Sequence, residues 1–378
     1  MNPLWDKYRE EMLEYIKPEH YERLQRLWSQ PHRFYHNETH LADILNSIET
    51  EKEKLTATNR VYYMLAAFYH DAYYSPTRLD NEKLCVELWK RDSMEIRYTH
   101  TNFFNEVKTL ILATEQHSSR DPFIKKFLDY DSRIALNGTD EEIFEWERGI
   151  FKEYQFVAYP VYKKQRLDFL NRWKHIHPEA EYVVNVLTAY LTWWKPRVGV
   201  FVGSFNPYHI GHEDVRLQAE KIFDKVIVAK GKNPDKVSTP VKATKSKKVV
   251  VVTEPVKAED PIDRVLPYTE TREFSGFQNE LVEQLENEGV DVTIIRSFRA
   301  DEDIPFEVAQ NRLVKKLGDV KSVFFLSNPG NEFISSTAIR AIKKVPTGNT
   351  EWSDKKDALL AEMIPSTFDY AWKDLFTL

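Results

Sequence analysis

One segment in the second half of the chain restricts the fold more than any other. Val198–Val202 is a short apolar run rich in β-branched residues, Gly203 ends it, and a helical pattern follows from His212 to Phe223. A buried strand that passes through a glycine turn into a helix is typical of a parallel α/β sheet. Further strands are expected at Lys225–Ala229, Val290–Ile295 and Ser322–Leu326, with a helix at Gln278–Glu288.

The first half of the chain has a different pattern. Its apolar residues recur at helical spacing, prolines separate the segments, and no run is a convincing strand. The clearest helical segments are Asn59–Phe68, Phe103–Ala113, Glu142–Phe156 and Ala180–Trp194. The character changes at Lys195-Pro196-Arg197. We therefore predict an all-α domain over 1–195 and a Rossmann-like, doubly wound α/β domain with a parallel sheet over 196–378.

Composition excludes several classes of protein. The 378 residues carry a net charge of −6, which argues against a dedicated nucleic-acid-binding surface. No stretch approaches the roughly 20 apolar residues that span a bilayer, and Met1–Glu14 lacks the apolar core of a signal peptide. Cys85 is the single cysteine, so a disulfide framework is excluded. A cytoplasmic protein without a membrane partner is expected.

The most informative motif is Gly203–His212, which reads GSFNPYHIGH. It follows a strand and opens a helix, where backbone N–H groups and the helix dipole favour a phosphate. Gly203 lets the chain turn and lets a phosphate approach closely. His209 and His212 are three residues apart across Gly211 and can face one site, where imidazoles stabilise charge that develops at a phosphorus centre. The motif therefore predicts phosphate chemistry.

This segment resembles the signature of the nucleotidylyltransferase superfamily with a (T/H)xGH motif. Ile334–Arg340 resembles the ISSTxxR element of the same superfamily, in which hydroxyls at a helix start and one guanidinium suit a triphosphate. Within the superfamily, four further stretches resemble the phosphopantetheine adenylyltransferase family: Phe223–Lys236, Phe274–Phe277, Arg296–Asp303 followed by Phe306-Glu307, and Met363–Lys373. The resemblance covers most of residues 197–378.

The resemblance implies adenylyl transfer from ATP, with Mg²⁺, to a small phosphorylated acceptor. It implies catalytic roles for His212, His209, Lys236 and Arg299. The phosphate of phosphopantetheine would contact Ser204, Lys236 and Arg296. Nucleotide would contact Gly203, Ser204, Phe205, Gly211, His212, Arg299, Glu307, Ser335, Ser336, Thr337 and Arg340. The phosphopantetheine branch forms symmetric oligomers, which leaves a homo-oligomer open.

Two positions in the signature depart from that branch. Asn206 stands where an aspartate is usual, and His209 stands where threonine is usual. Both are closer to the nicotinamide mononucleotide branch, so nicotinamide mononucleotide is an alternative acceptor. In the phosphopantetheine branch a helix usually follows the loop that carries the substrate-binding lysine, here Lys236. In this chain Pro234–Pro267 replaces that helix. We expect this segment to be a solvated loop, and we assign it no role.

Histidines and carboxylates recur in order through the first half. His36 and His40 are one helical turn apart, and His70-Asp71 follows the apolar helix. His117 and the Asp129-Tyr-Asp131 element come later in the chain. Imidazoles and carboxylates together are the ligands that a divalent metal ion needs. Their order therefore predicts a metal site in the all-α domain.

The order H…HD…D resembles the HD superfamily of metal-dependent phosphohydrolases. This resemblance implies that His40, His70, Asp71 and Asp131 are the metal ligands, with Asp129 as an alternative to Asp131. His36, Glu82 and His117 would lie in a second shell or face the substrate. A metal of undetermined identity would polarise a phosphate oxygen and activate water for phosphoester hydrolysis. A domain that senses a nucleotide without turnover is the alternative.

Overall fold

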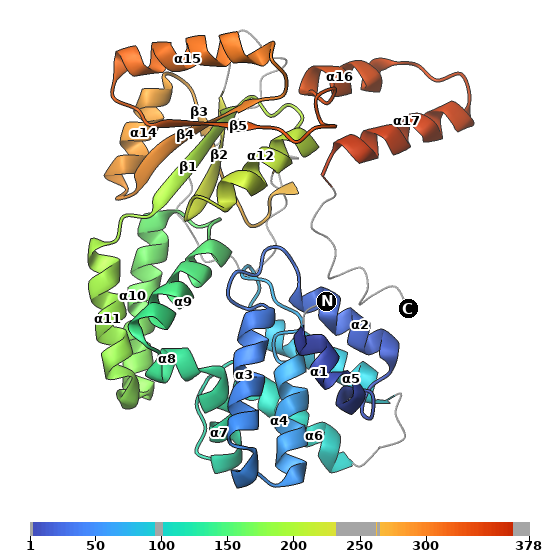
Figure 1. Ribbon diagram of the computed structural model, residues 1–378, viewed down its shortest axis with the longest axis vertical. Coiled ribbons are helices and arrows are strands. Elements are labelled where there is room, and N and C mark those ends of the chain that lie inside the picture. The colour runs from blue at the N-terminus through green and yellow to red at the C-terminus, as the bar shows by residue number, and fades with distance from the viewer. Residues whose placement is uncertain (1–2, 95–100, 232–261, 263–264, 366–378) are drawn as a thin grey trace. The chain divides into compact units, whose positions relative to one another are not determined.

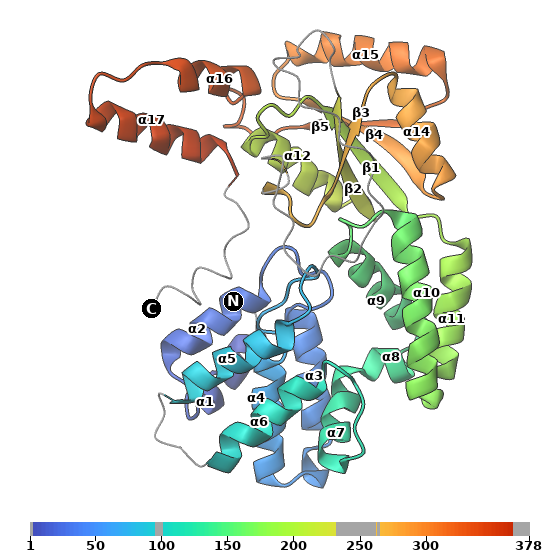
Figure 2. The same cartoon turned by 180° about the vertical axis from the view of Figure 1, so that it is seen from behind.

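The computed structural model describes residues 3–94, 101–231, 262 and 265–365. They form two compact units. A helical unit contains the described residues of 1–154 and 162–194, and an α/β unit contains Gln155–Val161 and the described residues of 195–370. Figures 1 and 2 show both units from opposite sides. Each unit has its own core, so each is described by itself.

The helical unit is built around one aromatic-rich core. Trp28, Leu41, Ile44, Phe68 and Phe127 are all fully or nearly fully buried in it. Its elements are α1 (Pro3–Met12), α2 (Pro18–Trp28), α3 (Glu38–Thr50), the 3₁₀ turn η1 (Lys52–Lys54), α4 (Ala57–Tyr69), α5 (Asn81–Met94), α6 (Thr101–Ala113), α7 (Pro122–Asp131), α8 (Arg133–Asn137), α9 (Asp140–Glu153), α10 (Tyr159–Ile176), η2 (Pro178–Ala180) and α11 (Glu181–Trp193).

Side-chain caps fix where several of these helices begin. Asn37 caps α3, Thr56 caps α4 and Asp121 caps α7, and each accepts a hydrogen bond from a backbone N–H of the first turn. Thr139 and Glu142 form a capping box at the start of α9. Such caps stabilise a helix by about 1 kcal/mol each and set its register. Register decides which side chains reach the centre of the unit.

The predicted helices are present, with one boundary corrected. The segments expected at Asn59–Phe68 and Phe103–Ala113 lie inside α4 and α6. The helix expected to reach Phe156 ends at Glu153. It ends there because Gln155–Val161 belongs to the α/β unit: Gln155 and Val157 bond to residues of that unit rather than continuing the helix.

The α/β unit is a five-stranded parallel sheet. Its strand order is β3-β2-β1-β4-β5, with β1 in the centre. Val200 of β1 pairs with Ile227 on one side and Ile294 on the other, and all three are buried. The strands are β1 (Arg197–Gly203), β2 (Lys225–Gly231), β3 (Glu270–Phe274), β4 (Asp291–Phe298) and β5 (Ser322–Leu326). The order reverses direction at β1, as in Rossmann-like, doubly wound sheets.

Helices cover both faces of this sheet (Figures 1 and 2). The chain moves one way across the sheet through α12 and the other way through α14 and α15, so right-handed crossovers put α12 on the opposite face from α14 and α15. The helices are α12 (Ile210–Glu220), α14 (Gln278–Asn287), α15 (Asp303–Leu317), α16 (Ser336–Lys344) and α17 (Thr350–Met363). The carboxyl ends of β1 and β4, on either side of the switch point, form the usual ligand-binding edge of such a sheet.

One element of the α/β unit differs from the sequence-based expectations. The edge strand β3 was not predicted, because its sequence Glu-Thr-Arg-Glu-Phe contains no apolar run. Of Met363–Lys373, the stretch that resembles the closing helix of the adenylyltransferase family, 366–373 lie outside the described residues. Most of the Pro234–Pro267 segment also lies outside them.

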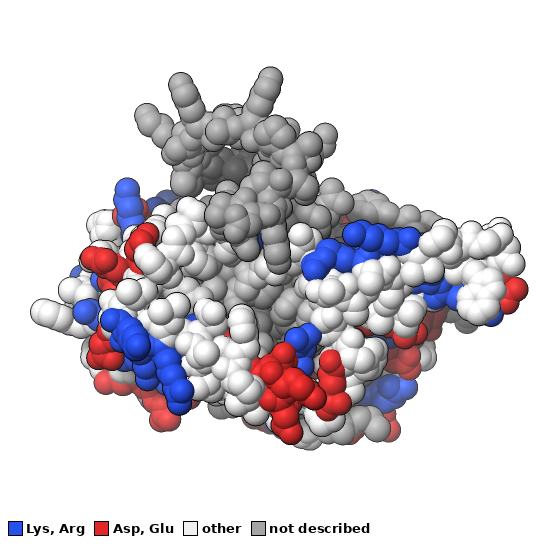
Figure 3. Space-filling view, turned by 90° about the horizontal axis from the view of Figure 1, so that it is seen from above, with Lys and Arg blue, Asp and Glu red and all other residues white. Residues whose placement is uncertain are grey.

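Charges of both signs interleave on the face shown in Figure 3, where no single sign dominates the described residues. Among the helices that the structure describes, none combines the length and apolarity required to cross a membrane.

We predict that Ile294→Ala destabilises the α/β unit by about 2–5 kcal/mol, because it leaves a cavity beside the central strand. Hydrogen exchange of peptides covering β1 and β4 measures this as faster opening of both strands. Leu326→Ala is the control: its side chain is 63% exposed, so the change should stay within about 0.5 kcal/mol. Equal effects of the two substitutions would contradict the assigned core.

Candidate functional sites

The turn after β1 is shaped by glycine and an unusual backbone. Phe205 adopts a left-handed conformation with φ of 42°, and the peptide bond of Asn206-Pro207 is cis. A Cβ atom on Gly203 would lie 2.9 Å from the Phe205 ring, so a side chain there would displace that ring. The glycine is therefore needed for Phe205 to fold back under the turn. Ser204 lies exposed at its tip.

His209 and His212 lie against each other at the start of α12. Their rings are stacked with centroids 3.6 Å apart, and a Cβ atom on Gly211 would lie 3.2 Å from the His209 ring. The backbone N–H of His209 donates to Nδ1 of His212 over 3.3 Å. A neutral imidazole with an accepting Nδ1 carries its proton on Nε2. His212 can therefore act as a hydrogen-bond donor through Nε2.

Electrostatics keep both imidazoles neutral. Burial lowers the pKa of His212 well below its usual value, and His209 and Arg299 lower it further. Burial and Arg299 also lower the pKa of His209 to about 4. The cationic form is disfavoured because burial removes its hydration and the positive charge of Arg299 opposes a second cation. Each neutral imidazole keeps one N–H, which can donate to developing negative charge.

Aromatic rings hold His212 in place. The ring centroids of Phe205, Tyr208 and Phe201 lie 4.9, 5.3 and 6.0 Å from that of His212. Phe205 and Tyr208 are both buried. The imidazole is therefore confined by packing as well as by its hydrogen bond, which limits the directions in which Nε2 can point.

The start of α16 contacts the same turn. Ser335 caps the helix, and the Ser336 hydroxyl donates to a carbonyl of Asn206-Pro207 over 2.8 Å. Arg340 donates to the other carbonyl of that pair and, over 3.0 Å, to Thr337. The structure thus brings the second predicted motif onto the first, although they are more than 120 residues apart in the sequence. A helix start placed here directs backbone N–H groups at any phosphate bound beside the turn.

Two arginines at the end of β4 are engaged with acidic residues. Arg296 is buried and donates to Glu307 over 3.0 Å and to Gln278 over 2.9 Å. Arg299 forms a two-pronged ion pair with Asp303. Sequence reasoning gave Arg296 and Glu307 separate ligands, whereas the structure pairs them with each other. Lys236, the other predicted phosphate contact, lies outside the described residues.

A second site lies in the helical unit. His40 Nε2, His70 Nε2 and an Asp131 carboxylate oxygen all lie within 4.8 Å of one another. Asp131 Oδ1 is 3.1 Å from His40 Nε2 and 3.3 Å from His70 Nε2, and Asp71 Oδ2 is 3.2 Å from His70 Nε2. The alternative ligand Asp129 points elsewhere, in an ion pair with a lysine one turn earlier in α7. The structure therefore favours Asp131 over Asp129.

The hydrogen bonding of His70 fits a metal ion. Its Nδ1–H donates to the carbonyl oxygen of Ala67 over 2.9 Å, so Nε2 is the ring nitrogen that faces the carboxylates. Asp71 and Asp131 outweigh burial and raise the pKa of His70 well above its usual value, so a metal ion bound here would displace the proton from Nε2. Nε2 is buried between Asp71 and Asp131 and has no hydrogen-bond partner among the residues that the structure describes. A backbone carbonyl that fixes one ring nitrogen while the other faces carboxylates is the usual arrangement of a metal-binding histidine.

The charge of this cluster is balanced by its histidines. Burial by itself would raise the pKa of Asp131, but the imidazoles of His70, His117 and His40 outweigh it and hold that pKa well below its usual value. His117 Nε2 is 3.1 Å from Asp131 Oδ2, the oxygen that faces away from His40 and His70. His117 adopts a left-handed backbone with φ of 48°, and His177 donates to its carbonyl oxygen.

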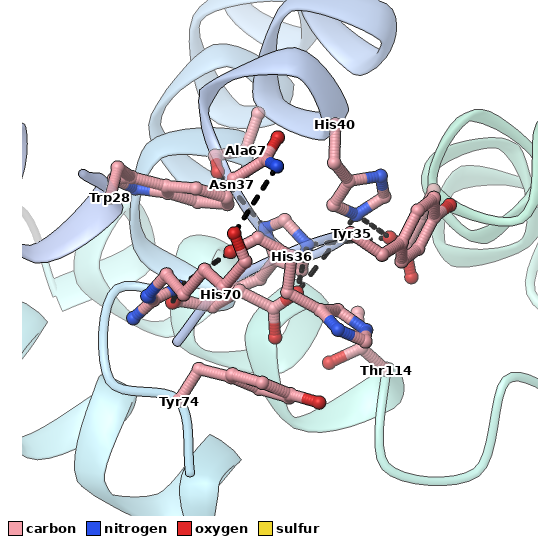
Figure 4. Close-up of polar contacts among 12 residues, drawn as sticks. Trp28, Tyr35, His36, Asn37, His40, Ala67, His70, Tyr74 and Thr114 are labelled. Atoms are coloured by element: carbon pink, nitrogen blue, oxygen red, sulfur yellow. Dashed lines mark hydrogen bonds and ion pairs between the residues drawn. The ribbon is translucent and has the colours of Figure 1, made fainter. Parts of the chain in front are cut away.

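His36 lies beside this cluster with its ring fixed from two sides. Its Nδ1–H donates to Glu153 over 2.7 Å, and its ring stacks on Tyr74 with centroids 4.2 Å apart. Figure 4 shows His36, His40 and His70 side by side. Burial would lower the pKa of His36, but the Glu153 carboxylate outweighs it and the pKa is raised. Glu82 is half-buried in the first turn of α5, and burial raises its pKa.

Two residues that organise this site were missed by sequence reasoning. The fully buried Glu153 accepts from three successive backbone N–H groups, those of 34–36, and from the hydroxyl of Tyr74. Arg33 donates to the carbonyl oxygens of His36, Asp71 and Ala72. For Arg33 the sequence contained a signal, because it lies in the PHRFYH segment only three residues before the predicted site residue His36. Glu153 lies more than 110 residues away and carried none.

Comparisons with known proteins concern the α/β unit. A family model described as cytidylyltransferase-like matches residues 200–342. Three curated relatives are phosphopantetheine adenylyltransferases. That of Clostridium tetani is 31% identical over 38% of this chain and 82% of its own length. That of Leuconostoc mesenteroides is 32% identical over 40% and 85%. That of Campylobacter concisus is 33% identical over 38% and 83%.

The matched region contains the strand–turn–helix segment, the stacked histidines and the start of α16. Through its α/β unit, the chain belongs to the cytidylyltransferase-like family of nucleotidyltransferases, which includes the phosphopantetheine adenylyltransferases.

Proposed function

We propose that the α/β unit transfers the adenylyl group of ATP to 4′-phosphopantetheine, which gives dephospho-coenzyme A and pyrophosphate. The observation that carries this proposal is the neutral His212, held at the start of α12 with Nδ1 accepting from His209 and the proton therefore on Nε2. We take phosphopantetheine as the acceptor because the three relatives are phosphopantetheine adenylyltransferases. The helix start of α16 against the same turn supports a triphosphate as the donor.

The reaction needs no covalent intermediate. A phosphate oxygen of the acceptor attacks the α-phosphorus of ATP, a new P–O bond forms, and the bond to the β-phosphate oxygen breaks. The electron pair leaves with pyrophosphate. Catalysis is then mostly positioning and charge stabilisation. Mg²⁺ bound with ATP would neutralise part of the triphosphate charge.

The described residues have distinct parts in this scheme. Nε2–H of His212 donates to an oxygen of the α-phosphate as charge develops, with His209 beside it. Ser336, Thr337 and the first N–H groups of α16 hold the β- and γ-phosphates, where Arg340 supports the turn. Arg299 adds positive charge next to both histidines. These groups are fixed before the substrate arrives.

Ser204, Lys236 and Arg296 bind the phosphate of the acceptor in this scheme. Arg296 has an unfilled donor: its Nε is buried and has no hydrogen-bond partner within the described ranges. A phosphate would therefore find one free N–H in addition to those now shared with Glu307 and Gln278. This supports a phosphorylated acceptor, and the relatives favour phosphopantetheine. Asn206 and His209 keep nicotinamide mononucleotide as the alternative.

We also propose that the helical unit is a metal-dependent phosphoester hydrolase. The observation that favours it is the buried Nε2 of His70, which lies 3.2 Å from Asp71 and 3.3 Å from Asp131 and has no hydrogen-bond partner in the described part of the chain. His40, His70, Asp71 and Asp131 would hold a divalent metal ion, which would activate water and polarise a phosphate oxygen. His36 would present Nε2 to the substrate, since its Nδ1–H is held by Glu153.

The first prediction from the proposed functions concerns turnover by the α/β unit. Pyrophosphate release from ATP and Mg²⁺ is measured with phosphopantetheine and with nicotinamide mononucleotide in parallel. We expect release with phosphopantetheine, and a fall in kcat of about 10²–10³ for His212→Ala, the usual cost of removing one donor to a transition-state oxyanion. His175→Ala removes an exposed histidine of α10 and should leave kcat unchanged.

Each outcome of this assay has a separate meaning. Release with nicotinamide mononucleotide alone would keep the chemistry and replace the acceptor. No release with either acceptor, or an unchanged kcat for His212→Ala, would contradict the proposal.

The second prediction concerns protonation of the stacked pair. An ordinary histidine titrates near pH 6.5. Because burial lowers the pKa of both His209 and His212, each should remain neutral from pH 8 to pH 5.5, with His209 half-protonated only near pH 4. Side-chain ¹⁵N NMR of histidine-labelled protein measures this. Half-protonation of His212 near pH 6.5 would exclude the neutral-donor mechanism.

The third prediction concerns the helical unit. Asp131→Asn should lower the affinity for a divalent metal ion at least tenfold. Mutating a residue that only hydrogen-bonds to a metal ligand already lowers affinity by about tenfold or more, and removing a ligand should cost at least as much. Asp129→Asn makes the same chemical change two residues away and should bind metal normally. Elemental analysis after dialysis against Mn²⁺ or Zn²⁺ compares the two. Equal metal content in both variants would exclude this site, and nucleotide binding by a metal-free unit would favour a sensor.

A further inference from the structure

We infer that Arg216 is a positioning residue for the nucleotidyl-transfer site and holds the turn of His212 through Glu213 and Tyr208. The inference rests on the proposed function of the α/β unit. Arg216 lies one turn along α12 from His212, on the side of the helix that faces the sheet, and its side chain is only 6% exposed. It does not reach the turn itself, so its effect has to pass through other side chains.

Hydrogen bonds among three side chains make the connection. The Tyr208 hydroxyl donates to Glu213 Oε2 over 3.0 Å. Glu213 accepts from Arg216 in a fork, with Nε 2.9 Å from Oε2 and Nη2 2.6 Å from Oε1. Tyr208 belongs to the signature turn and packs on the ring of His212. Arg216 thus orients the Glu213 carboxylate, and this carboxylate orients the Tyr208 hydroxyl. The Tyr208 ring in turn packs against the His212 ring.

The other end of the guanidinium is anchored as well. Arg216 Nη1 donates to Glu220, at the end of α12. Glu220 also accepts from Gln155 Nε2 over 2.8 Å, and Gln155 Oε1 accepts from the backbone N–H of Val226 in β2. The helix is therefore tied to the sheet at its last turn and to the signature turn at its first. All of these contacts lie within the α/β unit.

Core stability does not require this arrangement. Replacing a buried ion-pair cluster with apolar side chains of similar size is often neutral or stabilising. A salt-bridged fork gives a defined direction that apolar packing lacks, because the bidentate geometry admits one orientation of the carboxylate. Its position beneath the signature turn is where a defined direction matters: displacing a reacting group by about 1 Å can cost about a hundredfold in rate.

The chain offers a matched control. Arg272 on β3 also bridges two glutamates, Glu270 and Glu288, and is similarly shielded, with 16% of its side chain exposed. It lies in the same unit, and its hydrogen bonds within the described residues go to Glu270 and Glu288 rather than to the signature turn or α12. Arg272→Met therefore removes the same kind of interaction as Arg216→Met without touching the proposed path.

The test compares full-length variants by stability, kinetics and NMR. We expect both methionine variants to lower the thermal midpoint by similar amounts. Arg216→Met should lower kcat for pyrophosphate release about 10–100-fold with KM for ATP changed less than about threefold, whereas Arg272→Met should leave kcat unchanged. Arg216→Lys keeps the charge without the fork and should recover part of kcat. Tyr208→Phe removes a single hydroxyl, so it tests the path even if Arg216→Met does not fold.

Histidine ¹⁵N NMR provides a readout that does not depend on turnover. In the wild type and in Arg272→Met, His212 should show a protonated Nε2 and an accepting Nδ1. In Arg216→Met and Tyr208→Phe we expect a mixture of tautomers. Unchanged His212 signals in these two variants, or equal kcat in both methionine variants, would overturn the inference. A wild type without activity but with the expected NMR changes would instead contradict the proposed function and retain the positioning role.

Discussion

The α/β unit depends on the pairing of β1 with a parallel partner on each side. Val200 lies between Ile227 and Ile294, and this central position makes β1 the strand at which the sheet reverses direction. Gly203 therefore lies at the switch point, where the connections leave towards opposite sides of the sheet. The left-handed Phe205, the stacked histidines and the start of α16 are all arranged around that point. The sheet thus supplies the place for the chemistry, and the turn supplies the donors.

The site of the helical unit differs, because its ionisable groups lie in the interior of a helix bundle instead of at the edge of a sheet. Its centre holds Asp71 and Asp131 among three imidazoles, and the positive character of the imidazoles offsets the cost of burying the carboxylates. A buried carboxylate outside the cluster, Glu153, fixes the turn that carries His36. Both units therefore place an acidic residue where it contacts the surroundings of a histidine: the buried Glu153 bonds to His36, and the partly buried Glu213 bonds to Tyr208, which packs on His212.

Sequence reasoning reached the elements with strong periodicity and the motifs with local geometry. The strands around Val200 and the helix α4 could be predicted because their apolar residues follow the patterns of buried strands and amphipathic helices. β3 was not, because an edge strand with charged residues lacks that spacing. Within the sites, His40 and His212 were legible from adjacent residues in the motifs, whereas Glu153 and Arg216 act through contacts that only the fold creates. The pairing of Arg296 with Glu307 was equally invisible, since each had a plausible ligand of its own.

The α/β unit is discontinuous in sequence, and this has a consequence for how the protein is made. Gln155 bonds to Val226, and Val157 accepts from Lys225, so these residues meet partners about 70 positions further along the chain. During synthesis they leave the ribosome well before β2 exists. The segment has to stay accessible, without its final partners, while α10 and α11 are being translated. A truncation at the apparent junction near residue 195 would separate the second unit from a part of itself, so the two halves of this polypeptide are not interchangeable modules that could be cut and rejoined there.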